Sequence, residues 1–173
     1  MNNEFSGTVK KEKPRFSARA VAVTGITAAV YTVATLAIAP LGYGAIQLRF
    51  SEIMVLLAFI DPGYGIGLVL GCLISNIFSP VGAIDVIFGT MGTIVAVIGI
   101  VKSKGLFAAS LWPTISMAVV SAGISIGSGL PYVPTLITVA LGEFAVVTLI
   151  GYPIFKALMK NGGLMEILRF NKD

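Results

Sequence analysis

Six side chains could bind a small solute, and they lie within or at the edges of long apolar stretches of the sequence. They supply three carboxylates, one guanidinium and two amides, and they are Gln47, Arg49, Glu52, Asn76, Asp85 and Glu143. An ionisable group at membrane depth costs at least about 2.5–3.5 kcal/mol on insertion scales, so such groups usually form pairs or serve a function. We therefore expect these six residues to recognise a small polar or planar solute.

Glu143 is the most informative of the six because of its expected depth. It lies about nine residues into the last apolar stretch, which at 1.5 Å per residue is roughly 13 Å below the outer surface. A carboxylate near the middle of a bilayer needs a cation or hydrogen-bond donors. Glu143 therefore either pairs with Arg49 or another group, or accepts hydrogen bonds from a ligand. For Glu52 and Asp85, the alternative is an ion pair with Arg49 that only fixes the helices.

The composition argues against several kinds of chemistry. The sequence has no His, and its one cysteine, Cys72, lies in an apolar stretch, so we expect no zinc site, no His-based triad and no disulfide. It contains no G-x-x-x-x-G-K-[ST] phosphate loop, so we expect that the chain does not hydrolyse ATP itself. We predict no catalytic residue, no metal site and no cofactor. A membrane-embedded enzyme lacks paired catalytic groups here, and a structural scaffold is the remaining alternative of that kind.

The composition is that of a membrane protein. Hydrophobic residues make up 56% of the 173 residues and charged residues 12%, with a mean hydropathy of +0.94, whereas soluble domains carry about 25% charged residues. Apolar stretches near the ~20 residues that cross a bilayer recur along the chain. We predict an all-α membrane protein with six transmembrane helices, at about residues 18–38, 51–60, 65–78, 84–101, 106–126 and 134–159. This domain (18–160) is flanked by a basic N-terminal tail (1–17) and a C-terminal tail (161–173).

The distribution of basic residues favours six spans over five. With the N-terminus in the cytosol, six spans leave only Arg49 of the 12 Lys and Arg residues on the outer side, which is the asymmetry that the positive-inside rule describes. Five spans are the alternative, because the second and third stretches are short and are separated only by Asp61-Pro62-Gly63. We therefore predict a multi-pass plasma membrane protein with both termini in the cytosol.

The first apolar stretch has a second interpretation as a signal peptide. Ala37-Ile38-Ala39 is similar to a small-residue cleavage site. However, the stretch is longer than the ~7–15 residues of a signal core, and more membrane segments follow it. We therefore favour a first transmembrane helix.

Small residues at helical spacing indicate close contacts between helices, because membrane helices gain little from hydrophobic association. The third predicted helix carries Gly67, Gly71 and Ser75, the fourth carries Gly89, Gly92, Ala96 and Gly99, and the first carries Ala18, Ala22, Gly25 and Ala29. Packing inside the bundle is the simplest role for any such stripe. The stripe on the first helix is the best candidate for docking a separate membrane subunit.

Four motifs, in order along the chain, resemble the QueT family. They are Gln47-Leu48-Arg49-Phe50-Ser51-Glu52, Gly71-Cys72-Leu73-Ile74-Ser75-Asn76, Asp85-Val86-Ile87-Phe88-Gly89, and Gly142-Glu143 with Gly151-Tyr152-Pro153. The similarity runs from about Ala28 to Pro153. Members of this family are predicted substrate-binding (S) components of energy-coupling-factor transporters for queuosine precursors. The resemblance implies a six-helix S-component fold, a pocket open to the outside, and assembly with a transmembrane coupling (T) subunit and two cytosolic ATPase subunits.

The resemblance also implies particular contacts. In the wider group an A-x-x-x-A pattern on the first helix docks the coupling subunit, and the matching pair here is Ala18 and Ala22, with Arg19 inside the pattern. The implied ligand is a 7-deazaguanine base, whose guanidine-like edge would donate to Glu143. Asp85 or Glu52 would pair with an exocyclic ammonium if an aminomethyl form is carried.

The fifth predicted helix departs from the family pattern. Pro113 is followed by Met117-Ala118 and then Ile124, where the family carries polar residues. Two alternative functions therefore stay open. One is an S component for a different vitamin-like ligand, and the other is a stand-alone transporter driven by a proton or sodium gradient, with Glu143 or Asp85 as the coupling group.

Overall fold

The described part of the protein is built from helices. The computed structural model describes residues 17–42, 47–80 and 82–170, so the predicted basic tail lies outside the described residues up to position 16. Within these ranges there are no strands. The elements are α1 (Ala18–Ala37), α2 (Ala39–Gly42), the 3-10 segment η1 (Phe50–Leu56), α3 (Leu57–Ile60), α4 (Tyr64–Asn76), α5 (Ala83–Lys102), α6 (Leu106–Ser128), α7 (Tyr132–Glu143), the π-helical segment η2 (Phe144–Gly151), α8 (Tyr152–Leu158) and α9 (Gly162–Leu168).

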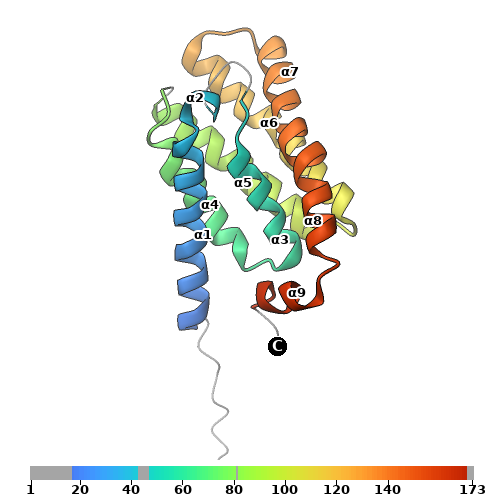
Figure 1. Ribbon diagram of the computed structural model, residues 1–173. Coiled ribbons are helices and arrows are strands. Elements are labelled where there is room, and N and C mark those ends of the chain that lie inside the picture. Colours follow the sequence, from blue (N-terminus) through green and yellow to red (C-terminus); the bar gives the residue numbers. More distant parts are fainter. Residues whose placement is uncertain (1–16, 43–46, 81, 171–173) are drawn as a thin grey trace, which may run out of the picture.

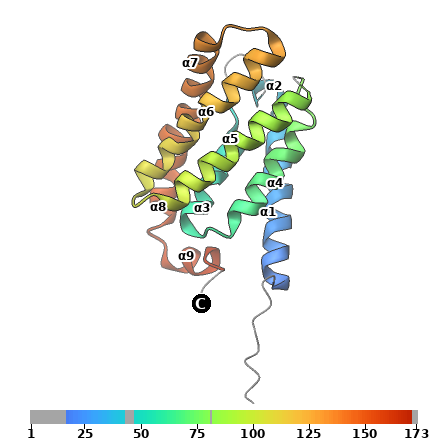
Figure 2. The same ribbon diagram turned by 180° about the vertical axis from the view of Figure 1, so that it is seen from behind.

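The bundle has two distinct ends, which Figures 1 and 2 show from opposite sides. One end carries α2 and the connection between α6 and α7, and we call it the α2 end (top of Figure 1). The other carries the start of α1, the turn between α3 and α4, and α9, and we call it the α9 end.

Local sequence features set several helix boundaries. Ser17 caps α1, because its side chain accepts a hydrogen bond from the Ala20 amide at 3.1 Å. Gly129 ends α6 with a left-handed backbone (φ 68°), and its amide bonds to the Ser125 carbonyl. Gly82 precedes α5 with φ 75°, a value that a residue with a Cβ rarely adopts.

Two of the small-residue stripes pack inside the bundle, as predicted. On α4, a Cβ added at Gly67 would lie 2.7 Å from the Thr24 carbonyl oxygen, and one at Gly71 would lie 2.8 Å from the Tyr31 Cβ, so α4 packs directly on α1. On α5, a Cβ added at Gly92 would lie 2.6 Å from Cγ2 of Val120, so α5 packs directly on α6. Glycine here allows the backbones to approach closely.

The α1 stripe does not pack against the chain itself. Ala18, Ala22 and Ala29 are exposed, and nothing lies within 4 Å of a Cβ added at Gly25. Since α4 covers the opposite side of α1 at Thr24, Thr27 and Ala28, α1 has one covered face and one open face of small residues.

The hydrophobic core lies toward the α9 end. It joins residues from α1, η1, α3, α4, α5, α6, η2 and α8, including Leu56, Leu68, Ile100, Val147 and Phe155. A second, smaller apolar cluster joins α6 and α7 through Met117, Val120, Ile124 and Val139.

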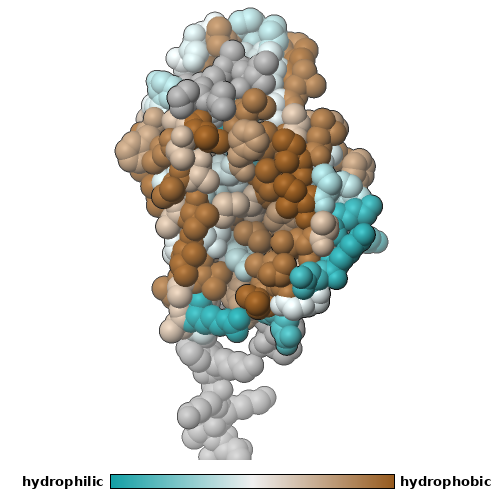
Figure 3. Space-filling view, in the orientation of Figure 1, coloured by the Kyte–Doolittle hydropathy of each residue, from teal (hydrophilic) through white to brown (hydrophobic). Residues whose placement is uncertain are grey.

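The surface is that of a membrane protein. Among the described residues, four helical segments are long and apolar enough to cross a bilayer: Ala18–Ala37, Ala83–Lys102, Leu106–Ser128 and Tyr132–Leu158. Phe50–Ile60 and Tyr64–Asn76 are apolar but shorter. Figure 3 shows apolar atoms over most of one face, with hydrophilic atoms gathered near the α9 end. The chain is therefore an all-α membrane protein, while the predicted count of six spans exceeds the four segments of full length.

Helix α9 lies in the segment that the sequence analysis described only as a C-terminal tail. Met165, Leu168 and Phe170 pack against the hydrophobic core, and the Tyr64 hydroxyl donates to the Leu168 carbonyl at 3.0 Å. The Phe170 ring meets the Tyr64 ring edge to face at 5.0 Å. These contacts fix the C-terminal segment to the start of α4.

Candidate functional site

Arg49 is the centre of a buried polar cluster near the α2 end. It follows a short non-helical segment and directly precedes η1, and its side chain is 6% exposed. Its Nη2 donates to Asn76 Oδ1 at 2.7 Å and lies 3.8 Å from Asp85 Oδ2, while its Nε donates to the Gly42 carbonyl at 3.3 Å. Non-helical backbone at membrane depth is tolerated where protein surrounds it, and this segment meets that condition.

Asn76 is held from several sides. Its Nδ2 donates to Cys72 Sγ at 3.3 Å, and Thr93 Oγ1 donates to the same sulfur at 3.0 Å. Gly89 lies directly against the Asn76 side-chain amide. That amide occupies the space that a Cβ at position 89 would need. Asn76 therefore presents its oxygen to Arg49 in a fixed orientation.

Glu52 lies one turn after Arg49 and has its own partner. The Tyr31 hydroxyl donates to Glu52 Oε1, and both residues are buried. Nearby, the Thr35 and Ser51 hydroxyls share a hydrogen bond of 2.7 Å, which ties η1 to α1 again. Sequence reasoning missed Tyr31, Thr35 and Ser51 because neutral hydroxyl side chains in apolar stretches carry no charge signal.

Glu143 is buried without a hydrogen bond on one carboxylate oxygen. The residue is 2% exposed, and its Oε1 has no partner among the described residues. It interacts electrostatically with Glu52 and Arg49, which brings it into the same cluster. Glu143 is also the last residue before the π-helical segment η2, and π-helical turns are frequent at functional sites.

Several other buried polar atoms lack hydrogen-bond partners in the described part of the chain. They are both carboxylate oxygens of Asp85 and the hydroxyls of Thr90, Thr114, Ser121 and Ser125. Buried polar groups in proteins are nearly always hydrogen-bonded, so each exception calls for an explanation such as a ligand or an ordered water. Thr90 is on α5 and the other three hydroxyls are on α6, and none was singled out from the sequence.

All six side chains predicted from the sequence are buried. The structure brings Arg49, Asn76 and Asp85 into contact and sets Glu52 and Glu143 within electrostatic range of Arg49. Gln47 is buried two residues before Arg49. The alternative of an Arg49–Asp85 pair is present as a contact of 3.8 Å, although it leaves Glu143 unpaired. The binding role of these residues stays a prediction.

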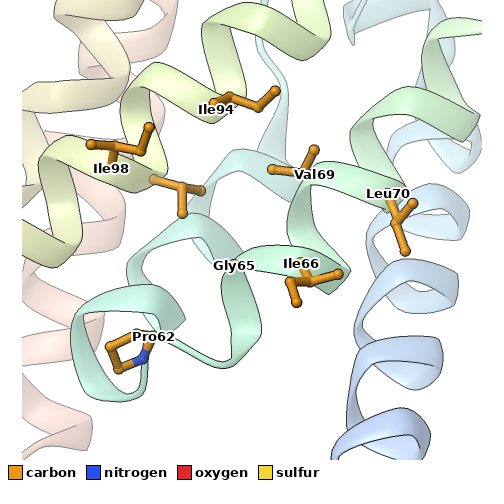
Figure 4. Close-up of a pocket in the computed structure, with 8 residues that line it drawn as sticks. Pro62, Gly65, Ile66, Val69, Leu70, Ile94 and Ile98 are labelled. Carbon is orange, nitrogen blue, oxygen red and sulfur yellow. The ribbon is translucent and has the colours of Figure 1, made fainter. Parts of the chain in front are cut away.

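A groove elsewhere on the bundle is purely apolar. Pro62, Gly65, Ile66, Val69 and Leu70 line it from the α3–α4 turn and α4, and Ile94, Val97 and Ile98 line it from α5 (Figure 4). Its volume is about 360 Å³. Since none of these lining residues has a polar side chain that could orient a polar solute, this groove is a poor candidate for the solute site.

Comparison with known proteins identifies the family. Residues 21–160 match the family described as QueT transporter. The chain is also similar to the queuosine precursor transporter QueT of Lactococcus lactis subsp. cremoris (strain MG1363), with 30% identity over 142 residues that cover 72% of this chain and 83% of that protein. No solved structure matches the chain. Since the family match spans most of the sequence and includes Arg49, Asn76, Asp85 and Glu143, the chain belongs to the QueT transporter family.

Proposed function

We propose that this chain is the substrate-binding component of an energy-coupling-factor importer and that it captures a queuosine precursor, a 7-deazaguanine base, from outside the cell. The single observation that carries the proposal is the buried Glu143 carboxylate near the Arg49, Asn76 and Asp85 group, because its Oε1 has no hydrogen-bond partner within the described ranges. A flat base with several N–H donors complements such acceptors. The printed name of the Lactococcus lactis relative supports this ligand class.

In this proposal the bundle crosses the membrane six times. The four long segments cross fully, and the shorter Phe50–Ile60 and Tyr64–Asn76 form a hairpin through the turn at Asp61, where the Gly63 amide donates to Asp61 Oδ1 at 2.9 Å. The described basic residues at the α9 end support a cytosolic position for that end; they are Arg19, Lys102, Lys104, Lys156, Lys160 and Arg169. Arg49 then lies on the outer side, and the ligand enters from the α2 end.

Each part of the ligand has a complementary group in the proposed site. Glu143 accepts from the guanidine-like edge of the base, in the middle of the bundle. Arg49 and Asn76 hold the outer wall, and their mutual hydrogen bond keeps both side chains in place before the ligand arrives. A site that is organised in advance loses less entropy on binding.

The open face of α1 supports docking of a transmembrane coupling subunit. Ala18, Ala22, Gly25 and Ala29 have no partner surface in the described chain, unlike the stripes on α4 and α5. Small residues allow another helix to approach closely. Because the sequence contains no phosphate loop, transport driven by ATP requires two ATPase subunits in addition to the coupling subunit.

Equilibrium binding tests the proposed ligand. The purified chain in detergent is titrated with 7-deazaguanine queuosine precursors, with guanine and an unrelated vitamin as specificity controls. We expect selective binding, and we expect Glu143→Gln to weaken it about tenfold or more, since hydrogen bonds to an ionised acceptor are about twice as strong as neutral ones. Glu166→Gln, on the exposed face of α9, is the matched control. A folded, monodisperse sample that binds none of these precursors rejects the ligand assignment.

Co-purification tests the proposed docking face. Ala22→Leu on the open face of α1 should reduce capture of co-expressed coupling and ATPase subunits, while Ala108→Leu, an equally exposed position on α6, should not. Equal capture by both variants would reject α1 as the docking helix.

Asp85 and Glu143, whose buried carboxylates have oxygens without hydrogen-bond partners among the described residues, also favour one competing function, an ion-coupled transporter that works alone. Proteoliposomes that contain only this chain distinguish the two. The importer proposal expects binding without uptake, whereas uptake abolished by collapsing the ion gradient would establish the competing function.

A further inference from the structure

We propose that the apolar groove between α4 and α5 binds an anionic phospholipid, with one acyl chain in the groove and the phosphate at Lys102. The function proposed above does not use this groove (Figure 4). The groove differs from the buried polar cluster in its position, its lining and its ligand, so the inference holds whichever solute the chain carries.

A glycine between larger apolar side chains gives the groove its depth. Gly65 forms part of the floor, where an added Cβ would lie only 2.9 Å from Cγ1 of Val97, which is itself buried. Ile66 of α4 and Ile98 of α5 also line the groove, and their side chains are exposed by 56% and 49%. The groove therefore has a closed floor and walls that face the surroundings of the bundle.

In a membrane the surroundings of this groove are hydrocarbon. The groove lies beside the second half of α5, one of the helical segments long and apolar enough to cross a bilayer. The bilayer core holds no water to fill an apolar groove, and an empty groove would lose van der Waals contacts. One turn of an α-helix, taken as a cylinder about 10 Å wide and 5.4 Å long, occupies roughly 420 Å³, which exceeds the groove volume of about 360 Å³. The groove therefore suits a single acyl chain better than a helix of another subunit.

A basic side chain lies at the end of the groove where a lipid phosphate is expected. Ile94, Ile98 and Lys102 follow one another at intervals of four residues and so lie along one side of α5. Lys102 is in the last turn of α5 and is exposed. The rise from Ile94 to Lys102 is about 12 Å, close to the ~15 Å of hydrocarbon that one leaflet contributes. An acyl chain that extends inward from a phosphate at Lys102 therefore follows the groove.

The exposed charge around this end of the groove is positive. Lys104 is also exposed and lies two residues after Lys102. Asp61, in the turn before α4, is 4% exposed and accepts a hydrogen bond from the Gly63 amide, so its charge is directed into the turn. Among the described residues, the exposed acidic side chain at the α9 end is Glu166, against six exposed basic side chains. Basic groups beside grooves between membrane helices attract anionic headgroups, so this end favours an anionic lipid over a zwitterionic one.

Lipids that share their acyl chains and differ in headgroup test the inference on the unmodified chain. The purified, delipidated full chain in detergent is titrated with dioleoylphosphatidylglycerol, dioleoylphosphatidylcholine or glycerol 3-phosphate, and native mass spectrometry measures the bound species. We expect phosphatidylglycerol to bind about fivefold or more tightly than phosphatidylcholine, the ratio that corresponds to about 1 kcal/mol for one lysine near the membrane surface. Glycerol 3-phosphate lacks an acyl chain and should not bind. Equal affinities for the two lipids, or equally tight binding of glycerol 3-phosphate, would overturn the inference.

Two pairs of matched variants then locate the lipid. Lys102→Gln should bring the two lipid affinities together, whereas Lys160→Gln, an exposed lysine after α8, should keep them apart. Val69→Phe places a ring in the groove and should weaken both lipids about fourfold or more, the contribution of one buried methylene. Val133→Phe, at an exposed position on α7, should leave both affinities unchanged.

The outcomes separate the lipid from other occupants. Unchanged lipid binding in Val69→Phe, together with lost capture of co-expressed coupling and ATPase subunits, would overturn the inference and assign the groove to a partner subunit. If Val69→Phe does not yield monodisperse protein, the lysine pair still decides. Equal headgroup preference in Lys102→Gln and Lys160→Gln would place the anionic lipid elsewhere on the bundle.

Discussion

Buried residues toward the two ends of the bundle differ in chemical character. Toward the α9 end, Leu68 and Ile100 are fully buried among other apolar side chains. Toward the α2 end, Asp85 and Glu143 are as well buried, yet both carboxylate oxygens of Asp85 and Oε1 of Glu143 lack hydrogen-bond partners among the described residues. The polar contacts described toward the α9 end are satisfied hydrogen bonds, such as that from the Tyr64 hydroxyl to the Leu168 carbonyl, whereas the unsatisfied carboxylate oxygens near the α2 end are not explained by packing. We infer that they are retained for binding.

The largest effect should come from breaking the contact between α1 and α4. Gly71→Leu would drive a side chain into Tyr31 and the Ala28 carbonyl, where even a Cβ would lie at 2.8 and 2.9 Å. We expect loss of monodisperse protein in size-exclusion chromatography. Gly25→Leu, at an open position on α1, is the control and should remain monodisperse. Similar profiles for the two variants would contradict the packing described for α4.

The next test places a polar side chain in the apolar core near the α9 end and an apolar side chain in the polar cluster near the α2 end. Leu68→Asn should lower the free energy of unfolding by about 2–5 kcal/mol, because it leaves a cavity and an unsatisfied amide. Glu143→Leu should raise it by about 1 kcal/mol, because it removes a buried unpaired carboxylate, while binding is lost. Thermal unfolding in detergent measures both. A large loss of stability in Glu143→Leu would mean that Glu143 serves the fold.

A smaller effect, on ligand affinity, is expected from disturbing the close contact between Gly89 and the Asn76 amide. Gly89→Ala would press a methyl group against the Asn76 amide and displace the acceptor of Arg49. We expect affinity for the proposed 7-deazaguanine ligand to fall about three- to tenfold, consistent with one disturbed charged hydrogen bond of about 1.5 kcal/mol or less. Ligand titration measures this, with Gly105→Ala, an open position, as the control. Unchanged affinity would separate Asn76 from the site.

The smallest effect should follow removal of a supporting hydrogen bond. Thr93→Val keeps the shape of the side chain and removes the donor to Cys72 Sγ. Because sulfur is a weak acceptor, we expect a loss of about 0.5 kcal/mol in unfolding free energy and less than about a twofold change in affinity. A tenfold loss of affinity would instead place the Cys72 and Thr93 contact within the binding site.

The sequence predicts the elements of this bundle better than their contacts. Hydropathy and turn residues such as Asp61-Pro62-Gly63 locate the apolar helices to within a few residues, because burial in lipid demands continuous apolar stretches. Charge at membrane depth singles out Arg49, Asp85 and Glu143.

Other features carry no such signal. The bond between Tyr31 and Glu52 joins residues 21 positions apart, and a tyrosine in an apolar helix resembles a packing residue. The sequence also does not indicate a role for the hydroxyls of Thr90 and Ser121, because Thr and Ser in membrane helices often form hydrogen bonds to their own backbone. Helix α9 is short, and its position depends on contacts with Tyr64 that local sequence does not encode.

The π-helical segment Phe144–Gly151 separates the last long helix into two α-helical parts, α7 and α8. The geometry of this segment sets the orientation of one part around the helix axis relative to the other. Each residue of an α-helix advances about 100° around the axis. A slip of one residue between π and α geometry would therefore turn α8 by about that angle relative to α7. Glu143 directly precedes this segment in the sequence, and Phe155, part of the hydrophobic core, follows it in α8. The carboxylate and its neighbour in the core therefore lie on one continuous helix, on opposite sides of the π-helical segment, so their relative orientation around the helix axis depends on the geometry of that segment.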